Sequence, residues 1–529
     1  MIKRRKNIIS FLLLFSMLVC CFTGSAQQKT AVPHINILFA ISDDQSYPHA
    51  SAYGQKIFQT PVFDSIAANG ILFTNAFVAA PQCSPSRAAI LTGRHIWQLE
   101  EAGTHASLFP DKFPVFTDAL ERSGYFIGYT GKPWDPGNFQ AGGWKRNPVG
   151  PEYNARKLRS TPTTGISKTD YVANFQDFLS AKPDAQPFFF WFGAQEPHRN
   201  YEEGSGAAAG LSPDSIEVPS FLPDQGLVRN DMLDYALEIR WFDTQLGKML
   251  QLLKERGELA NTVVVVTSDN GMPFPYAKAN LQEYGIHVPL AVCGPVVTGK
   301  HRRIDDLISL TDLAPTFLDI AQVDHFKGIT GKTLLPLFSG SRSGLVDPSR
   351  SFVLAGRERH SHARPDNLGY PARAIRTARY LLIENFKTDR WPLGDPAPLD
   401  PKPVTDKTDM KPILEGYEDI DDSPTKSFII RNRKLYPDLF QLGFAKREQV
   451  ELYDISKDPD CMHDLSNDSA LKKVRDSLKK RLEQELTIQG DPRMNGRGDL
   501  FDSYPRFGLM RPFDGFKERG KYNPAYQKK

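Results

Sequence analysis

The chain is 529 residues long, has a formal net charge of +3 and is 40% hydrophobic, which is enough to bury a large core. Five cysteines are too few for a disulfide-held scaffold. After residue 26, Lys and Arg are interspersed with Asp and Glu without a basic block, so no nucleic-acid partner is expected.

The first 26 residues have the pattern of a secretory signal peptide. A basic start at Met1–Lys6 precedes an apolar run from Ile8 to Phe22 and the small residues before a cleavage site after Ala26. Cleavage there removes four basic and no acidic residues, which changes the net charge from +3 to −1. Because the apolar run is short for a membrane span, we expect an exported, periplasmic or secreted protein without a transmembrane segment in the mature chain. Lipidation at a cysteine within the run, Cys20 or Cys21, is the alternative.

Short apolar runs alternate with helical patterns through the first two thirds of the chain. Strands are expected at 35–42, 125–130, 187–193, 262–267 and 288–293, and helices at 60–69 and 231–256. This alternation predicts an α/β domain with a large, mostly parallel sheet flanked by helices.

Composition changes after about residue 340. Residues 390–425 are rich in Pro, Asp and Lys and are expected to form a long loop. Beyond them we expect a smaller α+β subdomain, with strands at 380–385 and 451–455, a helix at 468–486 and a tail that wraps the surface. The expected division is 1–26 signal peptide, 27–370 catalytic domain and 371–529 C-terminal subdomain. Cys293 and Cys461 could pair, but spacing alone does not show it.

Polar residues stand at the ends of four predicted strands. Asp43-Asp44 and Asp269-Asn270 each follow an apolar run directly, while Lys132 and His198 follow two others. Carboxyl ends of parallel strands meet at one edge of a sheet, where such folds place their chemistry. For either acidic pair alone, ordinary turn chemistry is the competing interpretation.

The segment Cys83-Ser84-Pro85-Ser86-Arg87, followed by Leu91-Thr92-Gly93-Arg94, is the most informative stretch. Pro85 suits the first turn of a helix and Ser84 is expected to cap it. Cys83 then lies at the positive end of the helix dipole, with Arg87 one turn later on the same face. Such a position stabilises the negative charge of a nucleophile or an anionic substrate. The alternative interpretation is an ordinary helix start without a function.

This string resembles the signature of the type I sulfatases of the alkaline phosphatase superfamily, in which a maturation enzyme oxidises the cysteine to formylglycine. The resemblance implies that Cys83 is converted in this way. It also implies that one divalent cation is held by Asp43, Asp44, Cys83, Asp269 and Asn270. Oxygen ligands without histidine suit a hard cation, so Ca²⁺ is expected and Mg²⁺ is the alternative.

The same resemblance implies roles for four further residues. Arg87, Lys132 and Lys278 would neutralise the charge on the sulfate oxygens while the metal activates the attacking hydroxyl. His198 would give a proton to the departing atom of the substrate. Taken singly, each lysine could equally be a surface residue and His198 a satisfied polar group.

One departure from the family pattern stands out. The family has Gly-Lys-Trp-His or Gly-Lys-Lys-His where this chain has Gly131-Lys132-Pro133-Trp134. The histidine that contacts the formylglycine hydroxyl is therefore absent at this position. His105 or another residue takes its place, and the sequence does not say which.

Two stretches, Glu196–Arg199 and Ser268–Pro275, resemble the heparan N-sulfatase (sulfamidase) branch. They imply a sulfated glycan substrate, with N-sulfated glucosamine of heparan-type glycosaminoglycans as the expected target. A carbohydrate O-sulfatase is the alternative. A phosphohydrolase of the same superfamily and an inactive glycan binder are the rivals from other classes.

Overall fold

The computed structural model describes residues 35–396 and 416–507. The expected signal peptide and much of the expected loop at 390–425 fall outside the described residues. Within the described ranges, no helix is long and apolar enough to cross a membrane.

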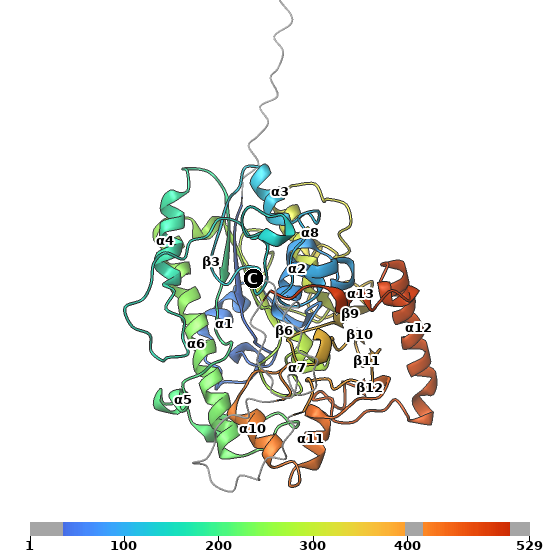
Figure 1. Ribbon diagram of the computed structural model, residues 1–529. Coiled ribbons are helices and arrows are strands. Elements are labelled where there is room, and N and C mark those ends of the chain that lie inside the picture. Colours follow the sequence, from blue (N-terminus) through green and yellow to red (C-terminus); the bar gives the residue numbers. More distant parts are fainter. Residues whose placement is uncertain (1–34, 397–415, 508–529) are drawn as a thin grey trace, which may run out of the picture. The chain divides into compact units, whose positions relative to one another are not determined.

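A sheet of eight strands lies at the centre (Figure 1), in the order β3-β4-β1-β5-β6-β2-β7, with β8 also paired to β2. Its strands are β1 Asn36–Ser42, β2 Ile71–Phe77, β3 Phe126–Gly131, β4 Phe188–Gly193, β5 Thr262–Ser268, β6 His287–Cys293, β7 Arg302–Ile304 and β8 Ile308–Ser309. All neighbouring pairs are parallel except those that β6 makes with β5 and β2. The mostly parallel α/β fold expected from the sequence is confirmed.

Helices cover both faces of this sheet because its central strands are apolar on both sides. In β1, Leu38 and Ala40 pack with α1 (Pro61–Ala68), α4 (Tyr171–Ala181) and α6 (Gly226–Glu255). The alternate side chains Ile37, Phe39 and Ile41 pack toward α2 (Cys83–Thr92), α3 (Phe116–Arg122) and α8 (Leu313–Ile320). All seven residues of β1 are buried, as a central parallel strand requires.

A second, antiparallel sheet has the order β12-β11-β10-β9. Its strands are β9 Phe352–Arg357, β10 Ala372–Thr377, β11 Tyr380–Asn385 and β12 Val450–Asp454. The expected domain boundary at 370/371 falls between β9 and β10, so this sheet takes its first strand from upstream of that boundary. Leu354, Ile375 and Leu382 pack with Trp97 from the first part of the chain and with Leu482 of α12 (Lys472–Ile488).

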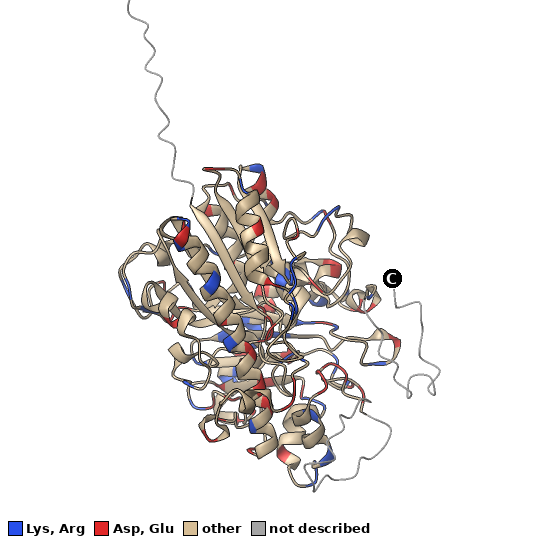
Figure 2. Ribbon diagram, turned by 90° about the vertical axis from the view of Figure 1, so that its left-hand side faces the viewer, with Lys and Arg blue, Asp and Glu red and all other residues tan. Residues whose placement is uncertain are grey.

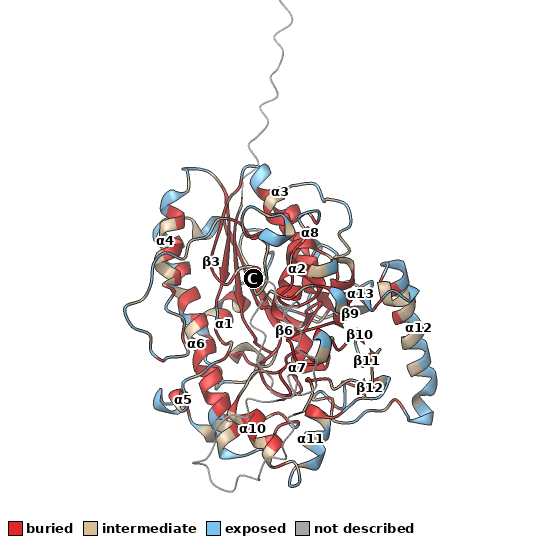
Figure 3. Ribbon diagram, in the orientation of Figure 1, coloured by how far each residue is buried: buried red, intermediate tan, exposed pale blue. Residues whose placement is uncertain are grey.

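The remaining α-helices of the described residues are α5 Ser205–Ala208, α7 Glu283–Ile286, α9 Leu335–Phe338, α10 Pro424–Arg431, α11 Pro437–Phe444 and α13 Leu500–Ser503. Figure 3 shows buried residues along the strands of both sheets and exposed ones on the outer side of α12 and α4. Basic and acidic residues are interspersed over the elements seen in Figure 2. Cys293 and Cys461 are both free thiols, so they do not form a disulfide.

Candidate active site

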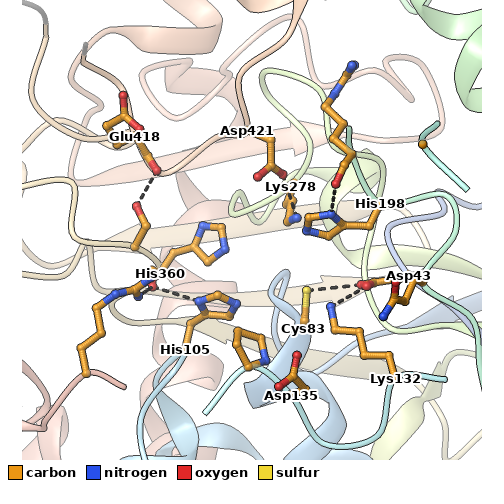
Figure 4. Close-up of a pocket in the computed structure, with 16 residues that line it drawn as sticks. Asp43, Cys83, His105, Lys132, Asp135, His198, Lys278, His360, Glu418 and Asp421 are labelled. Atoms are coloured by element: carbon orange, nitrogen blue, oxygen red, sulfur yellow. Dashed lines mark hydrogen bonds and ion pairs between the residues drawn. The ribbon is translucent and has the colours of Figure 1, made fainter. Parts of the chain in front are cut away.

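A cavity of about 390 Å³ lies at the carboxyl ends of β1, β3 and β4, and Figure 4 shows its side chains. Five predicted site residues line it: Asp43, Cys83, Lys132, His198 and Lys278. Eleven further residues line it, and among them are His105, Asp135, His360, Glu418, Asp421 and Arg506. Asp44, Arg87, Asp269 and Asn270 lie behind this lining and are fully buried.

The first turn of α2 places Cys83 in the pocket. The helix begins at Cys83 itself after Gln82, and every residue of it is buried. The expectation that Ser84 caps the helix is wrong, because its Oγ instead accepts the backbone N–H of Ala106 at 3.1 Å. Cys83 remains at the positive end of the helix, as predicted.

The two acidic pairs meet because β1 and β5 are neighbours in register, with Ser42 opposite Ser268. Asp269 Oδ1 accepts the backbone N–H of Asp44 at 3.1 Å, and Asn270 Nδ2 donates to Asp44 Oδ1 at 2.6 Å. Asp43 Oδ1 lies 3.4 Å from the Cys83 Sγ. The strand ends thus bring all four residues together beside Cys83.

These donors fit a hard cation. One ligand atom from each of Asp43, Cys83 and Asp269 lies within 4.8 Å of the others. The Asn270 Oδ1 is buried and has no hydrogen-bond partner among the described residues, which leaves an amide oxygen available as a further ligand. Carboxylate and amide oxygens are what Ca²⁺ and Mg²⁺ prefer.

Three basic side chains surround this acidic centre. Lys132 Nζ pairs with Asp43 Oδ2, and Lys278 Nζ donates to Asp44 Oδ2 at 2.7 Å. Arg87 does not line the pocket: its Nε donates to Asp269 at 2.7 Å and its Nη1 to the carbonyl of Lys132 at 2.7 Å. Arg87 therefore lies behind the pocket and connects α2 to the segments that follow β5 and β3.

Burial and charge set the protonation of these groups. Burial opposes ionisation of Asp43, but Lys132 and His198 hold its pKa well below the usual range. Burial and the charge of Asp43 raise the pKa of Asp269, although Arg87 opposes this. Burial, with Asp43 beside it, raises the pKa of the Cys83 thiol well above its usual value. An unmodified Cys83 is thus a protonated thiol and a poor nucleophile.

His198 reaches the pocket from the segment after β4. Its Nδ1 contacts the carbonyl of Arg199, which turns Nε2 toward the pocket, 3.9 Å from Asp44 Oδ2. Asp44, His198 and Asp421 offer ligand atoms within 4.8 Å of one another. Asp421 also accepts Lys278 Nζ at 2.8 Å, so it belongs to the same charge network.

The C-terminal tail does more than wrap the surface, contrary to the expectation from its composition. Arg506 lines the pocket and its Nη1 donates to the carbonyl of His360 at 2.6 Å. Arg359 holds the carbonyls of Tyr504 and Pro505 at 2.7 and 3.0 Å. No local pattern in the sequence marks Arg506, because its role depends on partners about 146 residues upstream.

Trp134, which stands where the family has its histidine, does not line the pocket. Its side chain is 1% exposed and packs against Phe109, with the ring centroids 5.2 Å apart. The next residue, Asp135, does line the pocket. No histidine therefore follows Lys132 into the site, while His105 lines it from another segment.

Several known proteins are similar to this chain in sequence or in fold. A sequence model of the family described as "Sulfatase" matches residues 35–323, and one described as "N-sulphoglucosamine sulphohydrolase, C-terminal" matches residues 275–419. Homo sapiens N-sulphoglucosamine sulphohydrolase is 26% identical over 499 residues, covering 86% of this chain and 91% of the human protein. An ulvan-active sulfatase of Formosa agariphila is 24% identical over 483 residues, covering 86% of this chain and 75% of that protein.

Among solved structures, a protein in complex with its substrate D-glucosamine-2-N,6-O-disulfate has a TM-score of 0.58 at 19% identity. The match covers 87% of this chain and 98% of that one, which shows a common fold. The "Sulfatase" model covers more than half of the present sequence, including both acidic pairs, Cys83 and Lys278. The chain therefore belongs to the sulfatase family, enzymes that hydrolyse sulfuric esters.

Proposed function

We propose that this protein removes sulfate from N-sulfated glucosamine at the end of heparan-type glycans, with residue 83 as formylglycine and Ca²⁺ as its cation. The observation that carries the proposal is the meeting of Cys83 with Asp43 and Asp269 at the floor of a cavity that also contains Lys132, Lys278 and His198. An export route through a signal peptide belongs to the same proposal.

Formylglycine at residue 83 and the divalent cation would supply the chemistry that the unmodified chain lacks. Formylglycine offers a hydroxyl in place of a protonated thiol, and a divalent cation polarises oxygens bound to it. Asp43, Asp44, Asp269 and Asn270 would hold the cation.

The chain's own residues would bind the sulfate group, hold the site in place and protonate the departing atom. Lys132 and Lys278, already paired with carboxylates, bind and orient the sulfate oxygens from two sides of the pocket. Arg87 holds Asp269 and the backbone after β3 in place. His198, with Nε2 toward the pocket, gives a proton to the departing nitrogen.

A family model and a solved relative support a glucosamine substrate. The match at 275–419 is to the C-terminal part of N-sulphoglucosamine sulphohydrolase, and that stretch includes Lys278 and Glu418 of the pocket. The second candidate is a carbohydrate O-sulfatase, since the solved relative named above takes a sugar that carries 6-O-sulfate as well as N-sulfate.

A substrate panel separates these candidates. We expect sulfate release from terminal N-sulfated glucosamine to exceed release from 6-O-sulfated glucosamine, 3-O-sulfated glucosamine and sulfated galactosamine. Activity confined to O-sulfated sugars contradicts the N-sulfatase assignment, and phosphate release without sulfate release favours a phosphohydrolase. Binding without turnover indicates a glycan binder.

Maturation is tested on the same preparation. Mass spectrometry of the peptide with residue 83 should show an aldehyde or its hydrate, and Cys83→Ala should abolish sulfate release. Full activity of protein that carries only the thiol contradicts this part of the proposal.

A further inference from the structure

A second, much smaller cavity lies at one end of the antiparallel sheet, where β9 and β11 end and β10 begins. Its volume is about 10 Å³, which is room for a single atom of about the size of a water oxygen. Polar residues that line it are Asn280, Gln282, Arg357, Tyr370, Arg447 and Glu451. Five of these six are buried, and the side chain of Arg447 is 9% exposed. The cavity thus lies between the small sheet and the segment that follows Lys278.

Two of the lining side chains can donate hydrogen bonds but have no acceptor. The hydroxyl of Tyr370 and the Nε of Arg357 are buried and have no hydrogen-bond partner within the described parts of the chain. The guanidinium carbon of Arg357 lies 5.2 Å from the centre of the Tyr370 ring, so the two side chains are neighbours. A buried donor without an acceptor destabilises a fold, so both groups require an acceptor in the cavity.

Glu451, the carboxylate that lines the cavity, already has its own donors. Its Oε2 accepts from Gln282 at 3.0 Å, from Arg447 at 3.2 Å and from the Tyr453 hydroxyl at 2.6 Å. Its Oε1 accepts from Asn385 at 2.7 Å. Four hydrogen bonds use the capacity of a carboxylate, so Glu451 is not the acceptor for Tyr370.

The buried charges around the cavity do not balance. Asp419 Oδ2 is shared between Arg357 at 3.0 Å and Arg364 at 2.7 Å, and Glu451 pairs with Arg447. Three guanidinium groups therefore stand against two carboxylates, which leaves an excess of one positive charge. Burial, together with the charges of Arg364 and Arg447, lowers the pKa of Arg357 to about 10, although Asp419 opposes this. A buried cation in this position requires a further negative charge.

We infer that this cavity binds one chloride ion, held by the Tyr370 hydroxyl, the Arg357 guanidinium and the charge of Arg447. Chloride only accepts hydrogen bonds, and it carries the one negative charge that the cluster lacks. A water molecule would accept from both donors, but it would leave the charge excess in place and need acceptors for its own protons. Sulfate and phosphate have five heavy atoms and are too large for a cavity of this volume. The site is therefore selective against the anion that the active-site pocket is proposed to bind.

The chloride site is connected to the active-site pocket through the backbone on both sides. Asn280 accepts from Arg447 at 3.3 Å and lies two residues after Lys278, while Asp419 lies two residues before Asp421. Lys278 and Asp421 are themselves joined at 2.8 Å in the pocket. Chloride thus stabilises the two segments that carry this pair without contacting the substrate.

Crystals of the protein soaked in sodium bromide give the direct test, because bromide replaces chloride and scatters X-rays anomalously. We expect an anomalous peak in the cavity between Tyr370 and Arg357, and a weaker one in Tyr370→Phe, which lacks the donating hydroxyl. A cavity that holds a water molecule only, without an anomalous peak, overturns the inference.

Thermal unfolding gives a second test in solution. At constant ionic strength, replacing gluconate, which is too large for the cavity, with chloride should raise Tm by about 2–4 °C, because a ligand that binds only the folded state stabilises it. Tyr370→Phe should lose most of this rise. Tyr380→Phe, on the same sheet but outside the cavity, should keep it. Equal chloride effects in the two variants overturn the inference. Neither test requires turnover, so both are independent of the proposed function.

Discussion

Lys278 links two carboxylates that lie far apart in the sequence. Its Nζ donates to Asp44 at 2.7 Å and to Asp421 at 2.8 Å, and its side chain is only 1% exposed. Burial alone would lower the pKa of Lys278, but Asp421 and Asp44 raise it well above its usual range. The lysine is therefore charged and held in one position, which its proposed binding of sulfate requires.

Substitution of Asp421 should therefore disturb catalysis rather than folding. In Asp421→Asn, Lys278 keeps only Asp44 and shifts toward it, so we expect kcat/KM to fall by about tenfold or more. Asp422→Asn is the matched control, because Asp422 pairs with Lys426 on α10 and does not line the pocket. Steady-state sulfate release measures both variants, and equal rates would contradict a positioning role for Asp421.

The amide of Asn270 gives a test of the cation site that does not require activity. Asn270→Ala removes the unpartnered Oδ1, and we expect the calcium affinity to fall by about tenfold or more. Asn147→Ala is the control, a buried asparagine whose bonds are to the backbone of Trp134 and Val149. Titration calorimetry on protein with unmodified Cys83 compares them. Equal affinities, or a stoichiometric transition metal in the purified protein, would exclude the proposed ligand set.

At the scale of elements, α2 begins at Cys83 and ends at a glycine. Gly93 ends the helix with φ 65°, and its N–H donates to Ala89 at 2.9 Å. An added Cβ would lie 3.1 Å from Ile329 and 3.2 Å from Ala314. The left-handed conformation and the close packing both require glycine here.

A pair of glycine substitutions separates the effect of the left-handed backbone conformation from the effect of close packing. Gly93→Ala and Gly257→Ala both place a side chain at a positive φ, 65° and 71°, but nothing lies within 4 Å of Gly257. We expect about 1 kcal/mol of lost stability for Gly257→Ala and about 1–3 kcal/mol more for Gly93→Ala, from strain and from crowding respectively. Urea unfolding with equal losses for both variants would mean that the α2 terminus relaxes freely.

The elements that could be predicted are those whose signal is local. The run 262–267 is β-branched and apolar, so its strand, buried on both faces, follows from residue type alone. The same kind of run at β6 could not reveal that this strand is antiparallel, because direction depends on the connections around it. The acidic pairs and Cys83 stand in recognisable strings, whereas Asp421 and Arg506 reach the pocket only through long-range folding.

At the scale of the molecule, the small sheet is joined to the large one by buried charges. Arg376 of β10 donates to Glu283 of α7, and both side chains are at most 7% exposed. Glu283 also contacts His287 at the start of β6. The pocket takes residues from both sides of this junction, so its shape depends on the junction remaining intact.

Removing one partner should destabilise the whole fold. Arg376→Ala leaves Glu283 buried with less compensation, and we expect a loss of about 3–5 kcal/mol in the free energy of unfolding. Arg379→Ala breaks the pair with Asp454, in which Arg379 is 52% exposed, and should cost about 0–1 kcal/mol. Denaturant unfolding compares the two. A small loss for Arg376→Ala would show that the two sheets do not depend on this contact.

The burial of α2 also has a consequence for timing. The folded protein buries this stretch: Ser84, Ser86 and Arg87 are 0% exposed and Cys83 is 1% exposed. A second protein therefore cannot bind these side chains once α2 is packed in the fold. If Cys83 is oxidised as proposed above, the oxidation has to take place on a nascent or still unfolded chain. Protein that folded first would keep its thiol, and adding a maturation enzyme afterwards should restore activity only after denaturation. The yield of active protein would then depend on the rate of Cys83 oxidation relative to the rate of folding.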